Sequence, residues 1–455
     1  MIWIKSYGKD AMGTAGIKRH LSSAQVIILS FIAAILLGSL VLMLPLATRD
    51  GLGASFPDAL FTAVSATCVT GLVVQDTATY WSGFGQAVLL LMIQVGGMGV
   101  VTMAVAIAMA SGKKISLMQR STMQEAISAP KVGGIVQLTG FILRWTFLFE
   151  IVGAAALATV FIPRFGLGKG IWYSVFHAIS AFCNAGFDLM GVQEPFSSLT
   201  GFAAQPVVNI ALMLLITIGG IGFLTWEDIG THRFHIRRYR MQTKVILTAA
   251  AVLLLLPAVY LFIFELGELP LSERVWAALF QSVTLRTAGF NTIDLTEISE
   301  SGQSMMIVMM LTGGAPGSTA GGMKTTTLVV LLSTAIAVFR RRADTQLFGR
   351  RLDDDIVRRA ATILTLYLAL FLLGGAVISR VENLPLLSCL FETASAVGTV
   401  GITLGLTPSL GLASRVILML LMFFGRVGGL TLIFAALAGY HPDRSKLPQE
   451  RLTVG

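Results

Sequence analysis

Four short stretches of this 455-residue chain repeat one pattern of residue types. In each stretch a phenylalanine is followed, 10, 10, 9 and 10 positions later, by a glycine and an apolar residue. The pairs are Phe61 with Gly71, Phe176 with Gly186, Phe280 with Gly289, and Phe391 with Gly401. Because glycine adopts main-chain dihedrals that are closed to other residues, it allows neighbouring carbonyl groups to point at a common axis.

The residues before these glycines are small or mildly polar, which leaves main-chain carbonyls as the principal lining. Carbonyl oxygens from four converging loops can replace the water shell of a dehydrated potassium ion. No ring of carboxylates occupies these positions, which argues against a calcium-type filter. We therefore predict a selectivity filter that holds K⁺ at the backbone carbonyls of Val69, Thr70, Gly71, Asn184, Ala185, Gly186, Thr287, Ala288, Gly289, Thr399, Val400 and Gly401.

The composition indicates that membrane helices position these loops. The chain is 55% hydrophobic and 13% charged, with a mean hydropathy of +0.79, whereas soluble domains carry about 25% charged residues. Eight segments are apolar over about the 20 residues that a bilayer requires. They lie near 24–46, 84–110, 136–162, 204–226, 244–265, 303–338, 360–380 and 412–438.

The phenylalanine stretches lie between the two spans of each pair. A stretch of about 11 residues reaches only about half the hydrocarbon thickness, so each is expected to enter as a short helix, turn, and leave again. The negative C-terminal ends of four such helices would favour a cation on the axis between them. The predicted fold is an all-α membrane protein of four parallel span–pore helix–span repeats, with eight transmembrane helices around a pseudo-four-fold central pore.

Basic residues set the expected orientation. The net charge is +9, and 23 of the 33 lysines and arginines fall in five segments beside apolar runs. This is the positive-inside pattern, which explains the charge better than nucleic-acid binding does. The N-terminus lacks the compact apolar core of a cleavable signal, so both termini are expected in the cytoplasm of a multi-pass protein.

This orientation divides the chain into alternating membrane repeats and cytoplasmic segments. The repeats are expected at 24–112, 136–230, 244–339 and 360–439, and the cytoplasmic segments at 1–23, 113–135, 231–243, 340–359 and 440–455.

The sixth span is interrupted at 312–324, where five glycines and a proline cannot continue a helix. A phosphate-binding loop is disfavoured because Met323 occupies the position of the required lysine and no strand precedes it. We expect instead a mobile constriction below the filter. Its candidate gate residues are Gly313, Gly314, Pro316, Gly317, Ser318, Thr319, Gly321, Gly322 and Lys324.

Other polar and glycine positions allow two interpretations each. Arg426 lies inside the eighth span, where a charge is costly, so it either has a function or extends to the surface. Glu392, in the fourth short helix, either orders its filter loop by hydrogen bonding or does not. Acids of the outer connections, such as Asp76 and Asp188, form either a solvated loop or a weak cation funnel. The clusters at 96–99 and 219–222 are attributed to close helix packing.

Four span–loop–span repeats with one glycine per loop, the third reading Arg286-Thr287-Ala288-Gly289-Phe290, resemble the Trk/Ktr/HKT superfamily of potassium transporters over essentially the whole chain. With eight spans, the chain is most similar to the Ktr-type membrane subunit. The resemblance implies a gate at the loop of the third repeat and an electrostatic barrier at Arg426 beside it. It further implies a bacterial inner-membrane homodimer on a cytosolic ring of subunits that bind ATP or ADP, with stimulation by Na⁺.

Two other classes of function remain for comparison. An alternating-access cation symporter usually has inverted repeats and titratable residues at the midplane, whereas these four repeats run in one direction. An intramembrane enzyme requires a catalytic set of side chains, and none emerges from the five histidines or the acids of the spans. The chain is therefore expected not to be an enzyme.

Overall fold

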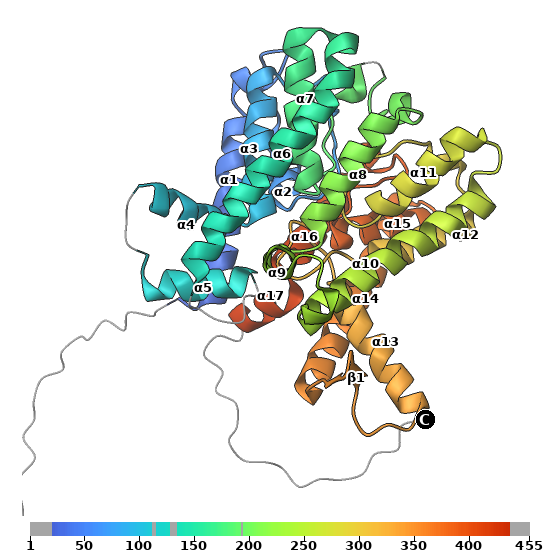
Figure 1. Ribbon diagram of the computed structural model, residues 1–455. Helices are drawn as coiled ribbons and strands as arrows, with labels where there is room; N and C mark the ends of the chain where they lie inside the picture. The colour runs from blue at the N-terminus through green and yellow to red at the C-terminus, as the bar shows by residue number, and fades with distance from the viewer. Residues whose placement is uncertain (1–20, 112–114, 128–133, 193, 437–455) are drawn as a thin grey trace, which may run out of the picture.

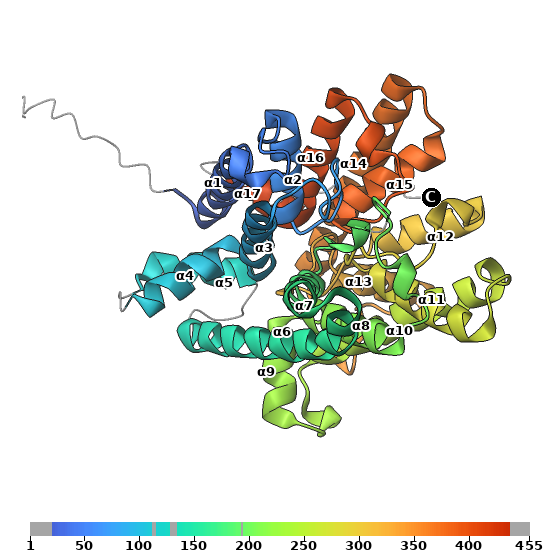
Figure 2. The same cartoon turned by 90° about the horizontal axis from the view of Figure 1, so that it is seen from above.

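The computed structural model describes residues 21–111, 115–127, 134–192 and 194–436, and these residues are mostly helical (Figure 1). The segments predicted as cytoplasmic ends, 1–23 and 440–455, lie almost wholly outside the described residues. Seen from above, the groups α1–α3, α6–α8, α10–α12 and α14–α16 follow one another around a common centre (Figure 2).

Among the described residues, four helices are long and apolar enough to cross a membrane. They are α1 (Ser23–Leu42), α6 (Ile135–Phe165), α10 (Met241–Tyr260, continued to Glu265 by a wider turn) and α14 (Asp354–Glu382). Each presents large apolar side chains outward: Leu37 is 66% exposed, Ile151 66%, Leu256 64% and Leu373 65%. Apolar surface of this extent on every long helix is suited to lipid rather than to water.

A short helix follows each long one and packs against it: α2 (Phe56–Thr67), α7 (Leu167–Phe182), α11 (Leu271–Thr284) and α15 (Leu386–Gly398). Ser55 caps α2 by accepting the N–H of Asp58, and Pro57 fills its first turn. Pro270 and Pro385 precede α11 and α15 in the same way. The phenylalanines of the repeated pattern are fully buried in these helices.

The helices that come after the short ones are broken, which corrects the expectation of continuous spans at 84–110 and 204–226. α3 (Gly83–Met98) and α4 (Val100–Ala110) are bent by 97° at Gly99, and α8 (Pro206–Gly220) and α9 (Phe223–His232) by 96° near Gly222. α16 (Leu412–Val427) ends at Gly428, before α17 (Gly429–Ala436). These glycines have φ of 86°, 92° and 92°, which side chains disfavour.

The expected interruption of the sixth span is present between α12 (Glu300–Met310) and α13 (Thr325–Phe339). The other three second spans are interrupted as well, at Gly99, near Gly222 and at Gly428. α5 (Leu117–Ile127) packs against α1, α4 and α6. A two-stranded antiparallel hairpin, β1 (Gln346–Leu347) and β2 (Arg350–Arg351), lies between α13 and α14. The hairpin lies at the end of the molecule opposite to α7 (Figure 1).

Candidate functional site

The four predicted filter glycines form a closed ring of contacts. A Cβ added to Gly71 would lie 2.5 Å from the carbonyl oxygen of Ala185, and one at Gly186 would lie 2.6 Å from that of Ala288. A Cβ added to Gly289 would lie 2.7 Å from the carbonyl oxygen of Val400, and one at Gly401 would lie 2.0 Å from that of Thr70. Each glycine therefore touches the residue before the next glycine, and the fourth returns to the first. A side chain at any of these positions would collide with main chain that cannot move aside.

The backbone of each loop is left-handed at two positions. The glycines have φ of 96°, 68°, 89° and 91° in chain order, as the sequence suggested. Val69, Asn184, Thr287 and Thr399, two positions earlier, were predicted as filter residues, but their left-handed backbone was not predicted; their φ values are 56°, 59°, 66° and 51°. Three of these four are β-branched, for which the left-handed region is unusual and strained. Left-handed backbone at one register of all four loops, three times at a β-branched residue, indicates a conformation imposed by the site.

A hydroxyl group at the end of each short helix holds its loop. Ser65 Oγ accepts the N–H of Gly71 at 3.1 Å, and Ser395 Oγ accepts that of Gly401 at 3.0 Å. In the other two loops the hydroxyl donates: Ser180 Oγ to the carbonyl of Phe187 at 2.7 Å, and Thr284 Oγ1 to that of Phe290 at 2.8 Å. The signal was available in the sequence, because all four residues stand four positions after the repeated phenylalanine.

The segments after two opposite loops are held by polar side chains that follow the same phenylalanine. Glu392 accepts hydrogen bonds from Leu404 N at 3.1 Å, Thr403 Oγ1 at 2.5 Å and Thr407 Oγ1 at 2.6 Å. The hydrogen bonding expected of Glu392 is thus present. His177 accepts the N–H of Leu189 at 3.3 Å, which is the corresponding contact in the second repeat.

Outside the helices, Asp188 lies two residues beyond the second filter glycine. Its carboxylate accepts the N–H of Met190 at 2.9 Å. Burial raises the pKa of Asp188 to about 6, and the nearby negative charge of Asp76 adds to this rise. Asp188 therefore titrates in the mildly acidic range.

The predicted gate residues form one closed loop. At its neck, Gly313 N donates to the Met323 carbonyl at 2.7 Å and Thr325 N donates to the Gly314 carbonyl at 3.0 Å. Ser318 Oγ donates to the Ala315 carbonyl at 2.6 Å within the loop. All nine predicted loop residues lie in this loop, with Lys324 at its exit as the residue before α13.

Glycines at the breaks of neighbouring helices hold this loop by main-chain contacts. Ala315 N donates to the carbonyl of Gly220 at 2.9 Å, and Thr319 N to that of Gly219 at 3.2 Å. Gly322 N donates to the carbonyl of Gly425 at 3.0 Å. The expected close packing at Gly219 is present, since an added Cβ would lie 2.1 Å from the Phe182 carbonyl. The glycines near the ends of α8 and α16 therefore also supply the carbonyl groups that bind the loop.

The loop 312–324, the predicted gate, lies directly against two of the predicted filter loops. Thr319 Oγ1 donates to Asn184 Oδ1 at 2.9 Å, which joins it to the second filter loop. A Cβ at Gly321 would lie 2.1 Å from Thr399 Oγ1 of the fourth. The structure thus brings the two sets of predicted residues into contact.

Arg426 points into this assembly rather than to the surface. Its guanidinium donates to the carbonyl oxygens of Thr319 in the loop and of Gly96 and Gly97 at the end of α3, the last at 2.9 Å. Lys324 Nζ donates to the Ala320 carbonyl at 2.8 Å. Both side chains line a cavity of about 280 Å³ that Glu125 of α5 also borders. The loop is thus bounded by cationic groups on the side of this cavity.

A family model described as TrkH, a cation transport protein, matches residues 18–446. The chain belongs to this family. The resemblance inferred from the four glycine loops is confirmed, and membership of a family of cation transporters agrees with the expectation that the chain is not an enzyme.

Curated relatives of this TrkH-family chain extend over nearly its full length. The potassium/sodium uptake protein NtpJ of Enterococcus hirae is 38% identical, over 96% of this chain and 98% of the relative. The Ktr system potassium uptake protein B of Bacillus subtilis is 39% identical, over 90% and 92%. The crystal structure of the potassium transporter TrkH from Vibrio parahaemolyticus shares the fold, with a TM-score of 0.70 at 19% identity over 94% of this chain and 86% of that one.

Proposed function

We propose that this chain is the ion-translocating subunit of a potassium uptake system, which conducts K⁺ through a carbonyl-lined filter. The observation that carries the proposal is the closed ring of glycine contacts, in which each loop abuts the next. Four equivalent main-chain loops around one axis supply the oxygen ligands that a dehydrated K⁺ requires. The names of the relatives, which are potassium or potassium/sodium uptake proteins, support the choice of ion.

In this proposal the filter lies on the axis of four span–pore helix–span repeats, with eight membrane crossings in a bacterial inner membrane and both termini in the cytoplasm. The repeat boundaries at 24–112, 136–230, 244–339 and 360–439 follow from it. The order of the helix groups around one centre (Figure 2) supports this arrangement, as does the basic character of the segments at 231–243 and 340–359.

The loop 312–324 acts as the gate in this proposal. It occupies the side of the filter where the second helices break, and Arg426 places positive charge beside it. Opening requires the loop to leave its carbonyl partners at Gly219, Gly220 and Gly425. Opening also breaks the hydrogen bonds that Asn184 and Arg426 form with Thr319, and a partner protein that binds the open arrangement more tightly shifts the equilibrium toward it.

The complete system in this proposal is a homodimer on a cytosolic ring of nucleotide-binding subunits, with Na⁺ as activator or co-ion. The names of the Ktr system relatives support membership of a larger uptake system, and the potassium/sodium name of the Enterococcus hirae relative supports the role of Na⁺. The homodimer and the nucleotide-binding ring are proposed from the family resemblance alone.

The test is potassium uptake in a bacterial strain that lacks its own uptake systems, comparing wild type, Gly289→Ser and Gly230→Ser. Gly289 has left-handed backbone and an added Cβ would meet the Val400 carbonyl, whereas Gly230 in α9 has open space around it. We expect Gly289→Ser to lose potassium affinity and discrimination against sodium while Gly230→Ser keeps both. Failure of wild type to restore growth at low potassium would refute the transport function. Unchanged selectivity in Gly289→Ser would refute the filter assignment but not the transport function.

The alternative is an alternating-access cation symporter. Deleting Gly313 to Lys324 separates the two mechanisms, because removing a gate from a channel speeds uptake, whereas removing a moving part from a symporter stops it. Faster uptake is expected. A slower or unchanged rate would count against the gate, and complete loss of uptake would favour the symporter.

A further inference from the structure

The end of α10 that begins at Met241 carries a basic pocket that the permeation pathway does not use. This pocket has a volume of about 470 Å³. Five cationic side chains line it together with Phe348: Arg237, Arg238, Arg240, Lys244 and Arg350. No acidic side chain lines it, so it is a strongly cationic hollow.

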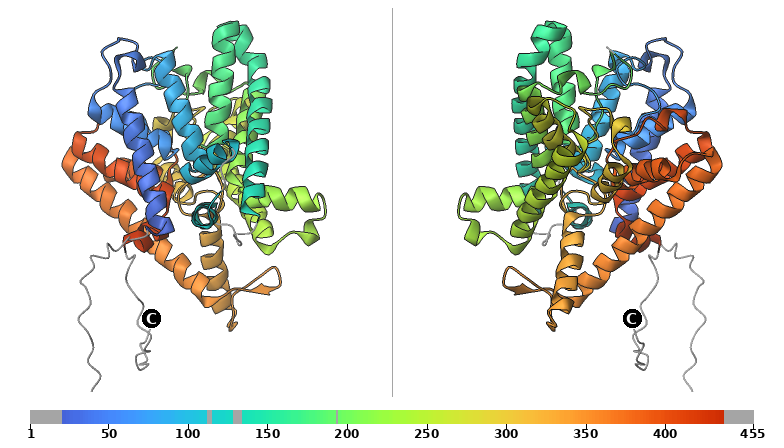
Figure 3. Two further views of the ribbon diagram at one scale, coloured as in Figure 1. Left: turned by 90° about the vertical axis from the view of Figure 1, so that its left-hand side faces the viewer. Right: turned by 90° about the vertical axis from the view of Figure 1, so that its right-hand side faces the viewer.

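The fold assembles this pocket from two segments that are distant in sequence. Four of its cations come from the α9–α10 connection and the first turn of α10, whereas Arg350 belongs to β2 of the hairpin. Both segments extend from the same side of the molecule (Figure 3). The positive charges from the two segments repel one another in this pocket. A bound anion would reduce that repulsion.

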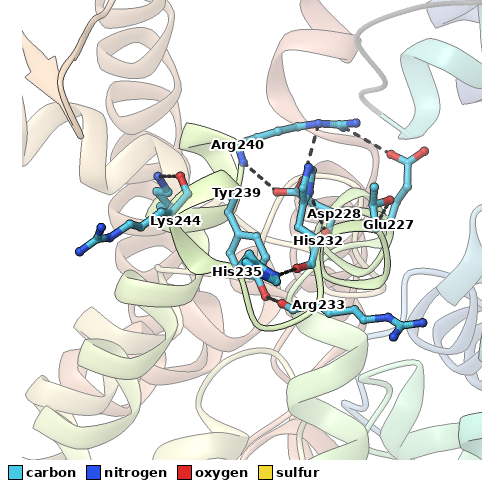
Figure 4. A network of polar contacts seen from close by, with 10 residues as sticks. Glu227, Asp228, His232, Arg233, His235, Tyr239, Arg240 and Lys244 are labelled. Atoms are coloured by element: carbon cyan, nitrogen blue, oxygen red, sulfur yellow. Dashed lines mark hydrogen bonds and ion pairs between the residues drawn. The ribbon is translucent and has the colours of Figure 1, made fainter.

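Little of this charge is neutralised by neighbouring carboxylates. Arg240 lies 3.3 Å from a carboxylate oxygen of Glu227 and 3.9 Å from one of Asp228, and Asp228 also lies 3.0 Å from His232 Nδ1 (Figure 4). Within the described part of the chain, the other four cations of the pocket form no ion pair with a carboxylate; Lys244 Nζ instead donates to the Arg237 carbonyl at 2.9 Å.

The position of the pocket along α10 indicates which anion it suits. Arg240 directly precedes the helix and Lys244 lies in its first turn, while Met241–Glu265 is long and apolar enough to cross a bilayer. Cations at the end of a span lie at the depth of lipid phosphates. Apolar side chains are exposed alongside: Phe348 in the pocket is 52% exposed, and Phe234 of the same connection is 97% exposed. Exposed aromatics at this level suit a membrane interface better than a soluble anion.

We propose that this pocket binds the phosphate of an anionic phospholipid headgroup, which holds the α9–α10 connection and the β1–β2 hairpin together. Arginine is the suitable residue type, because its guanidinium forms two parallel hydrogen bonds to a phosphate. Bound lipid would thereby link the connection between the second and third helix groups to the hairpin between the third and fourth groups at the membrane surface.

The test compares two triple variants of the full chain in nanodiscs of phosphatidylcholine with or without phosphatidylglycerol. The pocket variant is Arg237→Gln, Arg238→Gln and Arg350→Gln. The matched control is Arg340→Gln, Arg341→Gln and Arg359→Gln, which removes the same charge from exposed residues outside the pocket. Melting temperature and native mass spectrometry of retained lipid are the two readouts, and neither depends on potassium uptake.

We expect phosphatidylglycerol to stabilise wild type and the control and to bind the pocket variant at least about tenfold more weakly. Equal melting temperatures of all three proteins in pure phosphatidylcholine will show that the pocket variant is folded. Equal loss of phosphatidylglycerol in both variants would overturn the proposal, because charge alone would then explain the binding. Pocket-dependent binding of ATP that exceeds the binding of phosphatidylglycerol would also overturn it, in favour of a soluble polyanion.

Discussion

Thr319 of the intramembrane loop donates a hydrogen bond to the side-chain oxygen of Asn184 at 2.9 Å. Both side chains are almost fully buried, at 0% and 1% exposure. Asn184 is one of the left-handed residues of the filter loops, so this bond joins the strained backbone of one proposed functional element to the body of the other. Filter conformation and loop position are therefore linked by a direct contact.

Replacing Thr319 with valine keeps the shape of the side chain and removes this donor. Leaving the buried Asn184 oxygen without a partner costs about 1–3 kcal/mol, which weakens the closed position of the loop. We expect faster basal potassium uptake together with weaker discrimination against sodium. Thr319→Ser, which retains the hydroxyl, serves as the control in the same uptake assay. Wild-type rates and selectivity in Thr319→Val would contradict the link between filter and loop.

Arg426 holds the loop against the end of α3 through the carbonyls of Thr319, Gly96 and Gly97. Hydrogen bonds from a charged donor contribute about 1.5–3 kcal/mol each. We expect Arg426→Gln to raise the potassium uptake rate on the order of tenfold, because it removes both the contacts and the positive charge. Arg380→Gln, an exposed arginine of α14, controls for loss of charge alone. A rate at or below that of the control would count against the barrier.

Ser395 supports the fourth filter loop by accepting the N–H of Gly401. Ser395→Ala leaves this main-chain donor buried without its partner, at a cost of about 1–3 kcal/mol. We expect a lower melting temperature and a weaker potassium affinity, measured by thermal unfolding and by uptake at graded potassium concentrations. Ser304→Ala tests an exposed serine whose hydroxyl bonds only within its own helix, and it should alter neither quantity. Equal effects of the two substitutions would show that Ser395 has no special role.

Asp188 predicts a pH dependence of ion binding. The pKa of this carboxyl is raised to about 6, mainly by burial, so it is largely ionised at pH 7.5 and largely neutral at pH 5. Loss of its negative charge near the proposed filter entrance weakens attraction for K⁺ by about 0.2–1 kcal/mol, up to roughly fivefold in affinity. Uptake measured across this range should show the change in wild type, whereas Asp188→Asn should keep the weaker affinity throughout. The same pH dependence in both proteins would assign it to another group.

The local sequence was sufficient to predict the four long apolar helices, the four short helices after them and the interruption at 312–324. Hydropathy, proline at helix starts and runs of glycine act within a few residues, so they can be interpreted without a fold. The same local patterns misjudged the second spans at 84–110 and 204–226. Their apolar composition suggested continuous helices, while the tertiary structure uses Gly99 and Gly222 to bend them.

Contacts between distant segments were decided by the tertiary structure. Gly401 meets Thr70 across the whole chain, and Arg426 reaches the carbonyl of Gly96, 330 positions away. The left-handed conformations of Val69, Thr287 and Thr399 were likewise decided by the tertiary structure, since no property of valine or threonine favours them. The sequence by itself determined the four long apolar helices and the glycines at which the four loops turn. The close packing of four loops determined which carbonyl faces which glycine, because that depends on the surroundings each loop supplies to the next.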